Sequence, residues 1–229
     1  MKKSLLTAML AGLMSSPLMA QELNIKVTNL THGNTFTPIL ITAHGAANHI
    51  FQLGSTASNS VAAMAEGGSL DALMSDLNAL AADSTAASGL TAPAMSQSFS
   101  LSTQANNTHL SVVAMILPSN DGFMGADAIE IPNTAGTYDY YLNAYDAGSE
   151  ANDEIINGGG ALGTAGIPAD PAGHGGTGAT GVTTTEVTKV VHIHRGIIGD
   201  TDATGGRSDL DSRIHRWLNP VAKLTITVQ

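Results

Sequence analysis

The sequence predicts an all-β fold, an antiparallel β-sandwich of about eight strands with one short helical insertion. Short apolar segments recur along the chain and are separated by turns rich in Gly, Asn and Pro. Strands and helices do not alternate, which argues against the rival α/β sheet. The chain has no internal repeat and no linker of the kind that separates domains, so we expect a single domain over residues 21–229.

The individual elements follow from hydrophobic periodicity. Leu23, Ile25 and Val27 alternate with polar residues, which is the period-two pattern of a half-buried strand. Between residues 59 and 82, Ala, Met and Leu recur at helical spacing, and Gly67-Gly68 divides this stretch into two short helices. Further strands are expected over residues 38–44, 96–101, 109–117, 128–131, 137–143, 186–194 and 221–228. The Gly-rich residues 157–181 predict a mobile loop, and residues 201–216 predict a loop with a helical turn.

Residues 1–20 have the pattern of a cleaved secretory signal peptide. Lys2 and Lys3 precede a short apolar run, and Ala20 ends the segment with a small residue. The run is well short of the ~20 apolar residues that a membrane-spanning helix needs. We therefore expect an exported protein, periplasmic or extracellular, with no membrane insertion after signal cleavage.

Composition excludes several classes of function. With 9 basic against 19 acidic residues and a formal charge of −10, the chain offers no basic cluster for nucleic acid or an anionic membrane. The absence of cysteine excludes disulfides and cysteine-ligated metal. The sequence contains neither a Gly-x-Ser-x-Gly elbow nor a phosphate-binding loop with Lys. We therefore expect no catalysis.

The strongest candidate site lies between residues 117 and 154. Three consecutive antiparallel strands run up, down and up, so the loops after the first and third emerge at the same end of the sandwich. This brings Asp121 toward Asp146 and Glu150, which lie on one tight turn. No Lys or Arg occurs between Lys26 and Lys189, so a hard cation with oxygen ligands would relieve the repulsion among the acids. The alternative, equally open from spacing alone, is that these are solvated acids on turns.

Backbone carbonyls, water and the side chain of Asn120 could complete the ligand shell of such an ion.

At these residues the sequence resembles the spondin N-terminal domain family, in the form of stand-alone exported bacterial proteins. The resemblance extends from about residue 22 to residue 228, and it depends on the order and spacing of several short segments. These segments are residues 25–31, 36–38, 43–44, 51–54, 65–68, 118–123, 145–150, 192–194 and 217–222.

The resemblance implies a C2-like β-sandwich that binds calcium through aspartates at one end. In animal relatives the ligands come from a Pro-Asp-Trp segment and a Trp-Asp-Ala-Gly-Thr-Asp segment, which point to Asp121, Asp146 and Glu150 here. Glu150 stands where the animal pattern has Asp, and Gly122 or Phe123 stands where it has Trp. The animal members are extracellular-matrix and adhesion proteins, so the resemblance implies a binding role.

A second acidic loop runs from Asp200 through Asp202 to Asp211. Counted from Asp200 it matches the calcium-loop pattern in part, with acids at positions 1, 3 and 12 and Gly205 at position 6. Such loops are common on protein surfaces, so Asp200 and Asp202 are weaker candidates for metal ligands.

His192 and His194 are two residues apart on an expected strand and would lie on the same face. Two imidazoles so placed can hold zinc or copper, and a third could come from His44, His49 or His215. The alternative is that both histidines serve packing and hydrogen bonding.

Together these observations predict an exported calcium-binding domain whose partner is an extracellular or envelope protein or glycan. The rival hypothesis is a zinc or copper metalloprotein or metalloenzyme built on His192 and His194. A matrix component that needs no metal is the third possibility.

Overall fold

The computed structural model describes residues 20–183, 185, 186 and 188–229. The predicted all-β class is confirmed: the described residues form ten strands, paired antiparallel, and two short helices. The elements are β1 (Glu22–Asn29), β2 (Thr35–Phe36), β3 (Leu40–His44), α1 (Asn59–Gly67), α2 (Asp71–Ala79), β4 (Asp83–Ala86), β5 (Ser96–Ser102), β6 (His109–Leu117), β7 (Gly122–Glu130), β8 (Gly136–Asp146), β9 (His192–Ile193) and β10 (Ala222–Val228).

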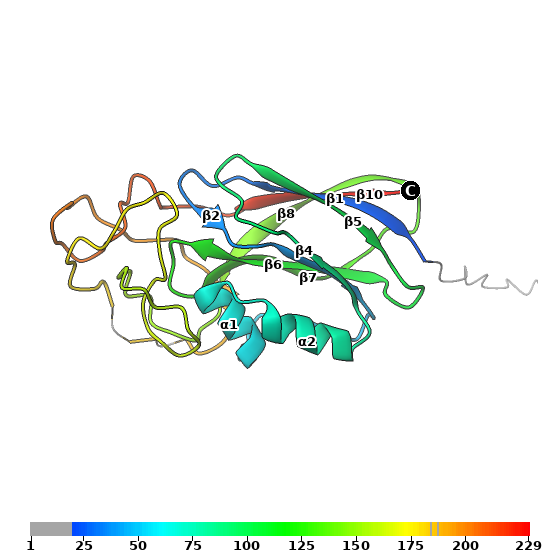
Figure 1. The fold of residues 1–229 in the computed structure, drawn as a ribbon, viewed down its shortest axis with the longest axis horizontal. Coiled ribbons are helices and arrows are strands. Elements are labelled where there is room, and N and C mark those ends of the chain that lie inside the picture. The colour runs from blue at the N-terminus through cyan, green and yellow to red at the C-terminus, as the bar shows by residue number, and fades with distance from the viewer. Residues whose placement is uncertain (1–19, 184, 187) are drawn as a thin grey trace, which may run out of the picture.

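The sheet has the strand order β4-β3-β6-β7-β8-β10-β1-β5, with β2 paired to β6 and β9 paired to β8. Its two ends, β4 and β5, contact each other, so the sheet curls into a nearly closed, barrel-like sandwich. Figure 1 shows β1, β5 and β10 in one layer, β6 and β7 in the other, and both helices against the outer side of the second layer.

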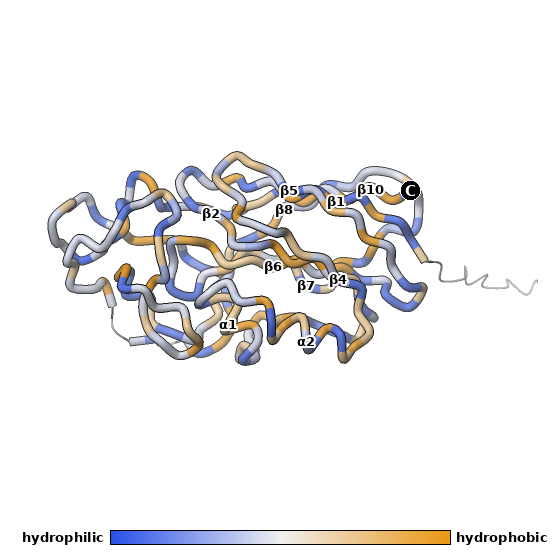
Figure 2. The backbone as a smooth tube through the Cα atoms, in the orientation of Figure 1, coloured by the Kyte–Doolittle hydropathy of each residue, from blue (hydrophilic) through white to orange (hydrophobic). Residues whose placement is uncertain are grey.

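Two hydrophobic clusters explain why some strands alternate and others do not. Val112 and Ala114 on β6 face the cluster between the layers, whereas Val113 faces the cluster beneath the helices with Val61 and Leu73. Because β6 is buried on both faces, its sequence is continuously apolar from Val112 to Leu117, while β1 buries one face and alternates. In Figure 2 the tube is accordingly hydrophobic along most of β6.

The predicted division of the helical stretch is confirmed. Ser58 caps α1 by accepting a hydrogen bond from the Val61 N–H at 3.2 Å. Gly68 ends α1 at a φ of 71°, and a Cβ there would lie 2.7 Å from a Thr37 methyl group. Only glycine combines this left-handed backbone with so close an approach.

The strand expected over residues 128–131 begins earlier, at Gly122. Its first half is rich in small residues, and Gly125 lies so close to the Phe51 ring that a Cβ would come within 3.0 Å of it. Small residues weaken a hydrophobic pattern, so this half of the strand has no period-two signal. The short strands β2 and β4 also lack that signal.

The strand expected over residues 186–194 is wrong for most of its length. Only His192–Ile193 is strand among the residues described there, and residue 187 lies outside them. Only His192 and Ile193 are paired in register with β8, and one further bond runs from the His194 N–H to the Ala144 carbonyl at 3.0 Å. The apolar pattern around Val191 therefore reflects burial under the helices and not a strand.

The segments between β8 and β9 and between β9 and β10 form the loop-rich end of the molecule, far from the C-terminus in Figure 1. Residues 157–181 are irregular, as expected, apart from an isolated bridge between Ile167 and Ile156, which immediately precedes the segment. The expected helical turn in residues 201–216 is present, closed by the His215 N–H donating to the Asp211 carbonyl at 2.9 Å.

Within the described residues, neither helix is long or apolar enough to cross a membrane. The expected signal peptide, residues 1–20, lies outside the described residues except for Ala20.

Candidate functional site

The predicted up-down-up path of three strands places Asp121 beside Asp146. Gly122, at the start of β7, pairs with Asp146 at the end of β8, and the Ala147 N–H donates to the Asp121 carbonyl at 3.2 Å. Both aspartates are buried, at 0% and 3% exposure. The two loops therefore meet at one end of the sandwich, as the sequence predicts.

A tight turn after β8 places the third acid. Gly148 has a φ of 66°, and a Cβ there would lie 2.6 Å from the Thr188 carbonyl oxygen. Its N–H donates to Asp146 Oδ1 at 2.8 Å, which closes the turn. Glu150 follows on the same turn and is 8% exposed.

The turn binds one oxygen of Asp121 and leaves the other without a partner. Asp121 Oδ2 accepts hydrogen bonds from the Ser149 N–H, the Ser149 hydroxyl and the Glu150 N–H at 2.9, 3.1 and 3.3 Å. Its Oδ1 is buried and accepts none. Glu150 repeats the pattern, since its Oε2 accepts from the Gly166 N–H at 3.1 Å while the buried Oε1 accepts none.

Burial and mutual repulsion raise the pKa values of these carboxyl groups. Burial, and then the neighbouring Asp146, raises the pKa of Asp121 to about 7. Burial, and then Asp121, raises the pKa of Glu150 to about 8. Burial also raises the pKa of Asp146. Among the described residues no Lys or Arg forms an ion pair with any of the three, so the cluster is short of positive charge.

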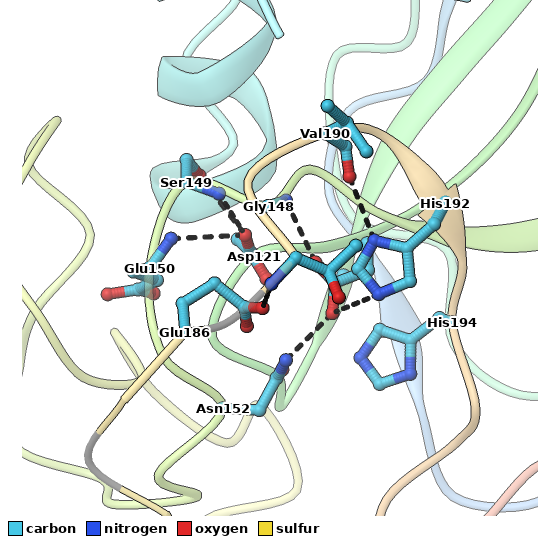
Figure 3. Close-up of polar contacts among 12 residues, drawn as sticks. Asp121, Gly148, Ser149, Glu150, Asn152, Glu186, Val190, His192 and His194 are labelled. Carbon is cyan, nitrogen blue, oxygen red and sulfur yellow. Dashed lines mark hydrogen bonds and ion pairs between the residues drawn. The ribbon is translucent and has the colours of Figure 1, made fainter. Parts of the chain in front are cut away.

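The structure adds His192 to this cluster, although its spacing from His194 predicts a separate imidazole site. His192 Nδ1 donates to the Val190 carbonyl at 2.9 Å, because a carbonyl can only accept. In the neutral ring Nε2 then carries a lone pair, and it lies 3.7 Å from Asp146 Oδ2. Figure 3 shows Asp121 and Glu150 on one side of the turn and the His192 ring on the other.

Two further residues of this cluster have no signal in the sequence. Asn152 donates to Asp146 Oδ2 at 2.7 Å, and the negative charge of Glu186 raises the pKa of Asp146 further. Asn and Glu are common in loops, and only the folded path of the chain brings these two to the aspartate.

His194 does not share the surroundings of His192. Its ring packs against Trp217 at 4.9 Å between centroids, and its Nδ1 accepts a hydrogen bond from the Gly196 N–H at 2.9 Å. Burial lowers the pKa of His194 to about 3, so the ring is neutral and its Nε2 carries the proton. His44, His49 and His215 each contact other groups, namely Ser111, Asp127 and Asp170.

The weaker oxygen candidates are engaged in local hydrogen bonds. Asn120 accepts from the Glu154 N–H at 3.0 Å and donates to Asp153 at 2.8 Å, which leaves no free amide group. Asp200 accepts from the backbone of Arg207, Ser208 and Asp202, and these bonds lower the pKa of Asp200. Asp202 in turn accepts from the Thr204 N–H at 3.0 Å. These contacts fix the turns of the second acidic loop.

A different cluster escaped the sequence analysis. Asp170, His174 and His215 come together at the loop-rich end, with ligand atoms all within 4.8 Å of one another. The Asp-x-x-x-His spacing of the first two is a weak signal, and His215 is 41 residues further along the chain.

Comparison with known proteins identifies one family. The family model described as Spondin_N matches residues 28–153. The match includes Asp121, Asp146 and Glu150, and it leaves out both His192 and the cluster of Asp170, His174 and His215. No curated protein matches the chain.

Proposed function

The chain belongs to the spondin N-terminal domain family, and on this basis we propose that it is an exported calcium-binding domain that works by adhesion and not by catalysis. Asp121, Asp146 and Glu150 would hold the ion at one end of the sandwich. The family supports a domain of extracellular type.

One observation carries the proposal: two buried carboxylate oxygens, Asp121 Oδ1 and Glu150 Oε1, accept no hydrogen bond. A buried polar atom without a partner costs free energy, and a buried carboxylate without one costs more. Both belong to acids whose pKa burial and repulsion have raised. A cation at either oxygen would supply a missing partner and offset part of the repulsion. The ligand atoms of the three acids do not all lie within 4.8 Å of one another in the structure, so an ion shared by all three requires their side chains to move toward it.

The donor set favours calcium. The candidate ligands of the three acids are all oxygen atoms, which hard cations prefer, and calcium accepts six to eight oxygens in flexible geometry. Backbone carbonyls of the two loops and water could supply the remaining ligands. Magnesium demands a stricter octahedron and loses its water reluctantly, so a mixed loop site suits it less.

A bound ion would act on recognition through the loops. It would join the loop before β7 to the turn after β8, which are otherwise linked by the Ala147 N–H and by the donors to Asp121 Oδ2. Loops gathered at one end of a rigid sandwich are a common place for partners to bind. We propose an extracellular or envelope protein or glycan as the partner.

One observation favours part of the rival hypothesis. With Nδ1 donating to a carbonyl, His192 presents Nε2 toward Asp146, as histidines that ligate transition metals commonly do. A zinc or copper ion held by His192 and Asp146 is therefore the second candidate. Of the two histidines, His194 is the weaker candidate for a metal ligand, because its Nδ1 already accepts a hydrogen bond from the Gly196 N–H.

Thermal unfolding in calcium, magnesium, zinc or EDTA separates these proposals. A ligand at about a hundred times its dissociation constant stabilises by ~2.7 kcal/mol, which corresponds to several degrees for a domain of this size. We expect this response to calcium, and we expect Asp146→Ala to lose it.

The control is Asp139→Ala, which removes an aspartate from the exposed part of β8 and should keep the calcium response. An unchanged midpoint in calcium, or a calcium response that survives in Asp146→Ala, would overturn the calcium proposal. A zinc response lost in His192→Ala would support the second candidate instead.

A further inference from the structure

The loop-rich end contains a second group of metal-ligating side chains, separate from the acid cluster. Asp170 Oδ2 lies 2.5 Å from His174 Nδ1 and 3.2 Å from His215 Nε2. The two imidazole rings are 5.7 Å apart at an interplanar angle of 77°. One carboxylate oxygen and two ring nitrogens therefore converge on a single small volume.

His215 supplies the second observation. Its side chain is 1% exposed, and its Nε2 has no hydrogen-bond partner. Although Asp170 Oδ2 is near, the direction from Nε2 to that oxygen does not satisfy hydrogen-bond geometry, so the contact is electrostatic. A buried imidazole nitrogen in this position calls for a partner that the described residues do not supply.

From this geometry we propose that Asp170, His174 and His215 form a binding site for a divalent transition metal of the zinc class. Two imidazole nitrogens and one carboxylate oxygen suit zinc and its neighbours, whereas calcium and magnesium prefer oxygen alone. Three protein ligands leave a fourth tetrahedral position for water or a bound group.

The surroundings provide charge and access. Burial alone would raise the pKa of Asp170, but contacts from His215, the Ala172 N–H and His174 outweigh it and lower that pKa to about 2. The carboxylate is thus ionised over the whole physiological range. His174 is 51% exposed and lines a cavity of ≈ 330 Å³ together with Thr201 and Arg213, which gives an ion an entry path.

Metal binding would change the tautomers of both histidines. His174 Nδ1 donates to the ionised Asp170 Oδ2, so ligation through Nδ1 requires that its proton move to Nε2. In the structure the Asp211 N–H donates to His215 Nδ1 at 3.0 Å, so the proton of the neutral ring is on Nε2. Ligation through Nε2 requires that this proton move to Nδ1, and the contact with the Asp211 N–H must then open. The lost hydrogen bond lowers affinity, and the proton shift gives the site a spectroscopic signature.

The site lies outside the segment that matches the family model, and it shares no ligand with the proposed calcium site. The two proposals can therefore fail independently.

Titration calorimetry with zinc chloride, in excess calcium to keep the acid cluster filled, tests the site. We expect one zinc ion per chain. His174→Ala and Asp170→Asn should each weaken binding at least as much as the roughly 10–100-fold that loss of an outer-shell partner costs. His174 is half exposed, so His174→Ala should keep the fold even if substitutions at the buried His215 do not.

His49→Ala is the matched control. His49 makes the same Nδ1 contact with a partly buried carboxylate, 2.5 Å from Asp127, but has no second histidine beside that carboxylate among the described residues. Zinc affinity unchanged in His49→Ala and reduced in His174→Ala would support the site. No zinc binding, or zinc binding lost in His192→Ala and retained in His174→Ala, would overturn it.

Nitrogen-15 NMR of the histidine rings gives a second readout. On zinc addition, His215 Nδ1 should change from an acceptor nitrogen to one that carries a proton. Zinc binding that leaves the His215 tautomer unchanged would place the ion elsewhere and overturn the proposal.

Discussion

Asp121 and Asp170 are both buried aspartates, and their surroundings shift their pKa values in opposite directions. Asp121 accepts three hydrogen bonds on one oxygen and none on the other, and the negative charge of Asp146 raises its pKa further. Asp170 accepts from the Ala172 N–H on one oxygen and faces two histidines with the other. The pKa of Asp121 is raised to about 7, while that of Asp170 is lowered to about 2.

The contrast teaches that burial does not by itself set the charge of a carboxyl. Burial disfavours the ionised form in both places, and the outcome depends on whether donors and positive partners outweigh it. Around Asp170 they do, so the carboxylate is part of the folded framework. Around Asp121 they do not, so that end of the sandwich needs a proton or a cation.

The largest expected change in the free energy of unfolding concerns Asp170. Asp170→Asn removes the charge that both histidines face and leaves His215 buried beside a neutral amide. Because His215 is neutral, with its Nδ1 accepting from the Asp211 N–H, the change removes contacts to a charged acceptor and not a buried ion pair, at a cost of up to about 3 kcal/mol. Urea unfolding in EDTA measures this loss. Asp202→Asn, at an exposed position of the second acidic loop, should leave the midpoint unchanged. Equal stability of Asp170→Asn and wild type would refute the role assigned to Asp170.

The pH dependence of stability tests the Asp121 half of the comparison. The folded pKa values of Asp121 and Glu150 lie above their unfolded values, so the folded state holds more protons and loses stability as pH rises through about 7 and 8. In EDTA the free energy of unfolding should fall on the order of 2 kcal/mol between pH 6.5 and 8.5.

Between these pH values, the change in stability reports on the acid cluster and not on His194 or Asp170. His194, with its pKa lowered to about 3, affects stability only below the unfolded histidine value near 6.5. Asp170 is ionised in both folded and unfolded chains throughout the window, so it contributes no slope. Calcium should flatten the profile. Urea midpoints that stay level or rise with pH in EDTA would contradict the raised pKa values.

The smallest effect has the opposite sign to the first. At pH 8 in EDTA, Asp121→Asn should raise stability by about 1 kcal/mol, because a neutral amide removes repulsion while its oxygen still accepts from Ser149. The same variant should lose the calcium response. Differential scanning calorimetry with and without calcium measures both.

Glu154→Gln is the control for the predicted gain in stability. Glu154 is 2% exposed, and both of its oxygens accept hydrogen bonds, from the Ile198 N–H on one and from Gly199 and Ser208 on the other. Its substitution should lower stability. If Asp121→Asn lowers stability in EDTA as Glu154→Gln does, the cluster is not under repulsion.

The acid cluster was accessible from the sequence because its geometry is local. Three consecutive strands, 109–117, 122–130 and 136–146, pair as neighbours, and antiparallel neighbours put alternate turns at the same end. The sequence therefore predicts that Asp121 lies near Asp146 and Glu150. The boundaries were less accurate, because Gly122 and Gly125 obscure the start of β7.

The histidines depended on contacts that no periodicity encodes. His192 and His194 are two residues apart, yet one faces Asp146 and the other packs on Trp217. Only two residues there pair with β8, so the rule that alternate residues share a face does not carry along the segment.

The sequence by itself determined the all-β class, the two helices divided at Gly68 and the meeting of the acids at one end, because each follows from a short-range pattern of hydrophobic, turn and charged residues. Only the tertiary structure decided that Asp170 and His174 meet His215, and that Asp121 Oδ1 and Glu150 Oε1 lack donors. Those outcomes depend on the path of long irregular loops and on which hydrogen-bond acceptors stay unsatisfied after folding. Neither property produces a periodic pattern in the sequence.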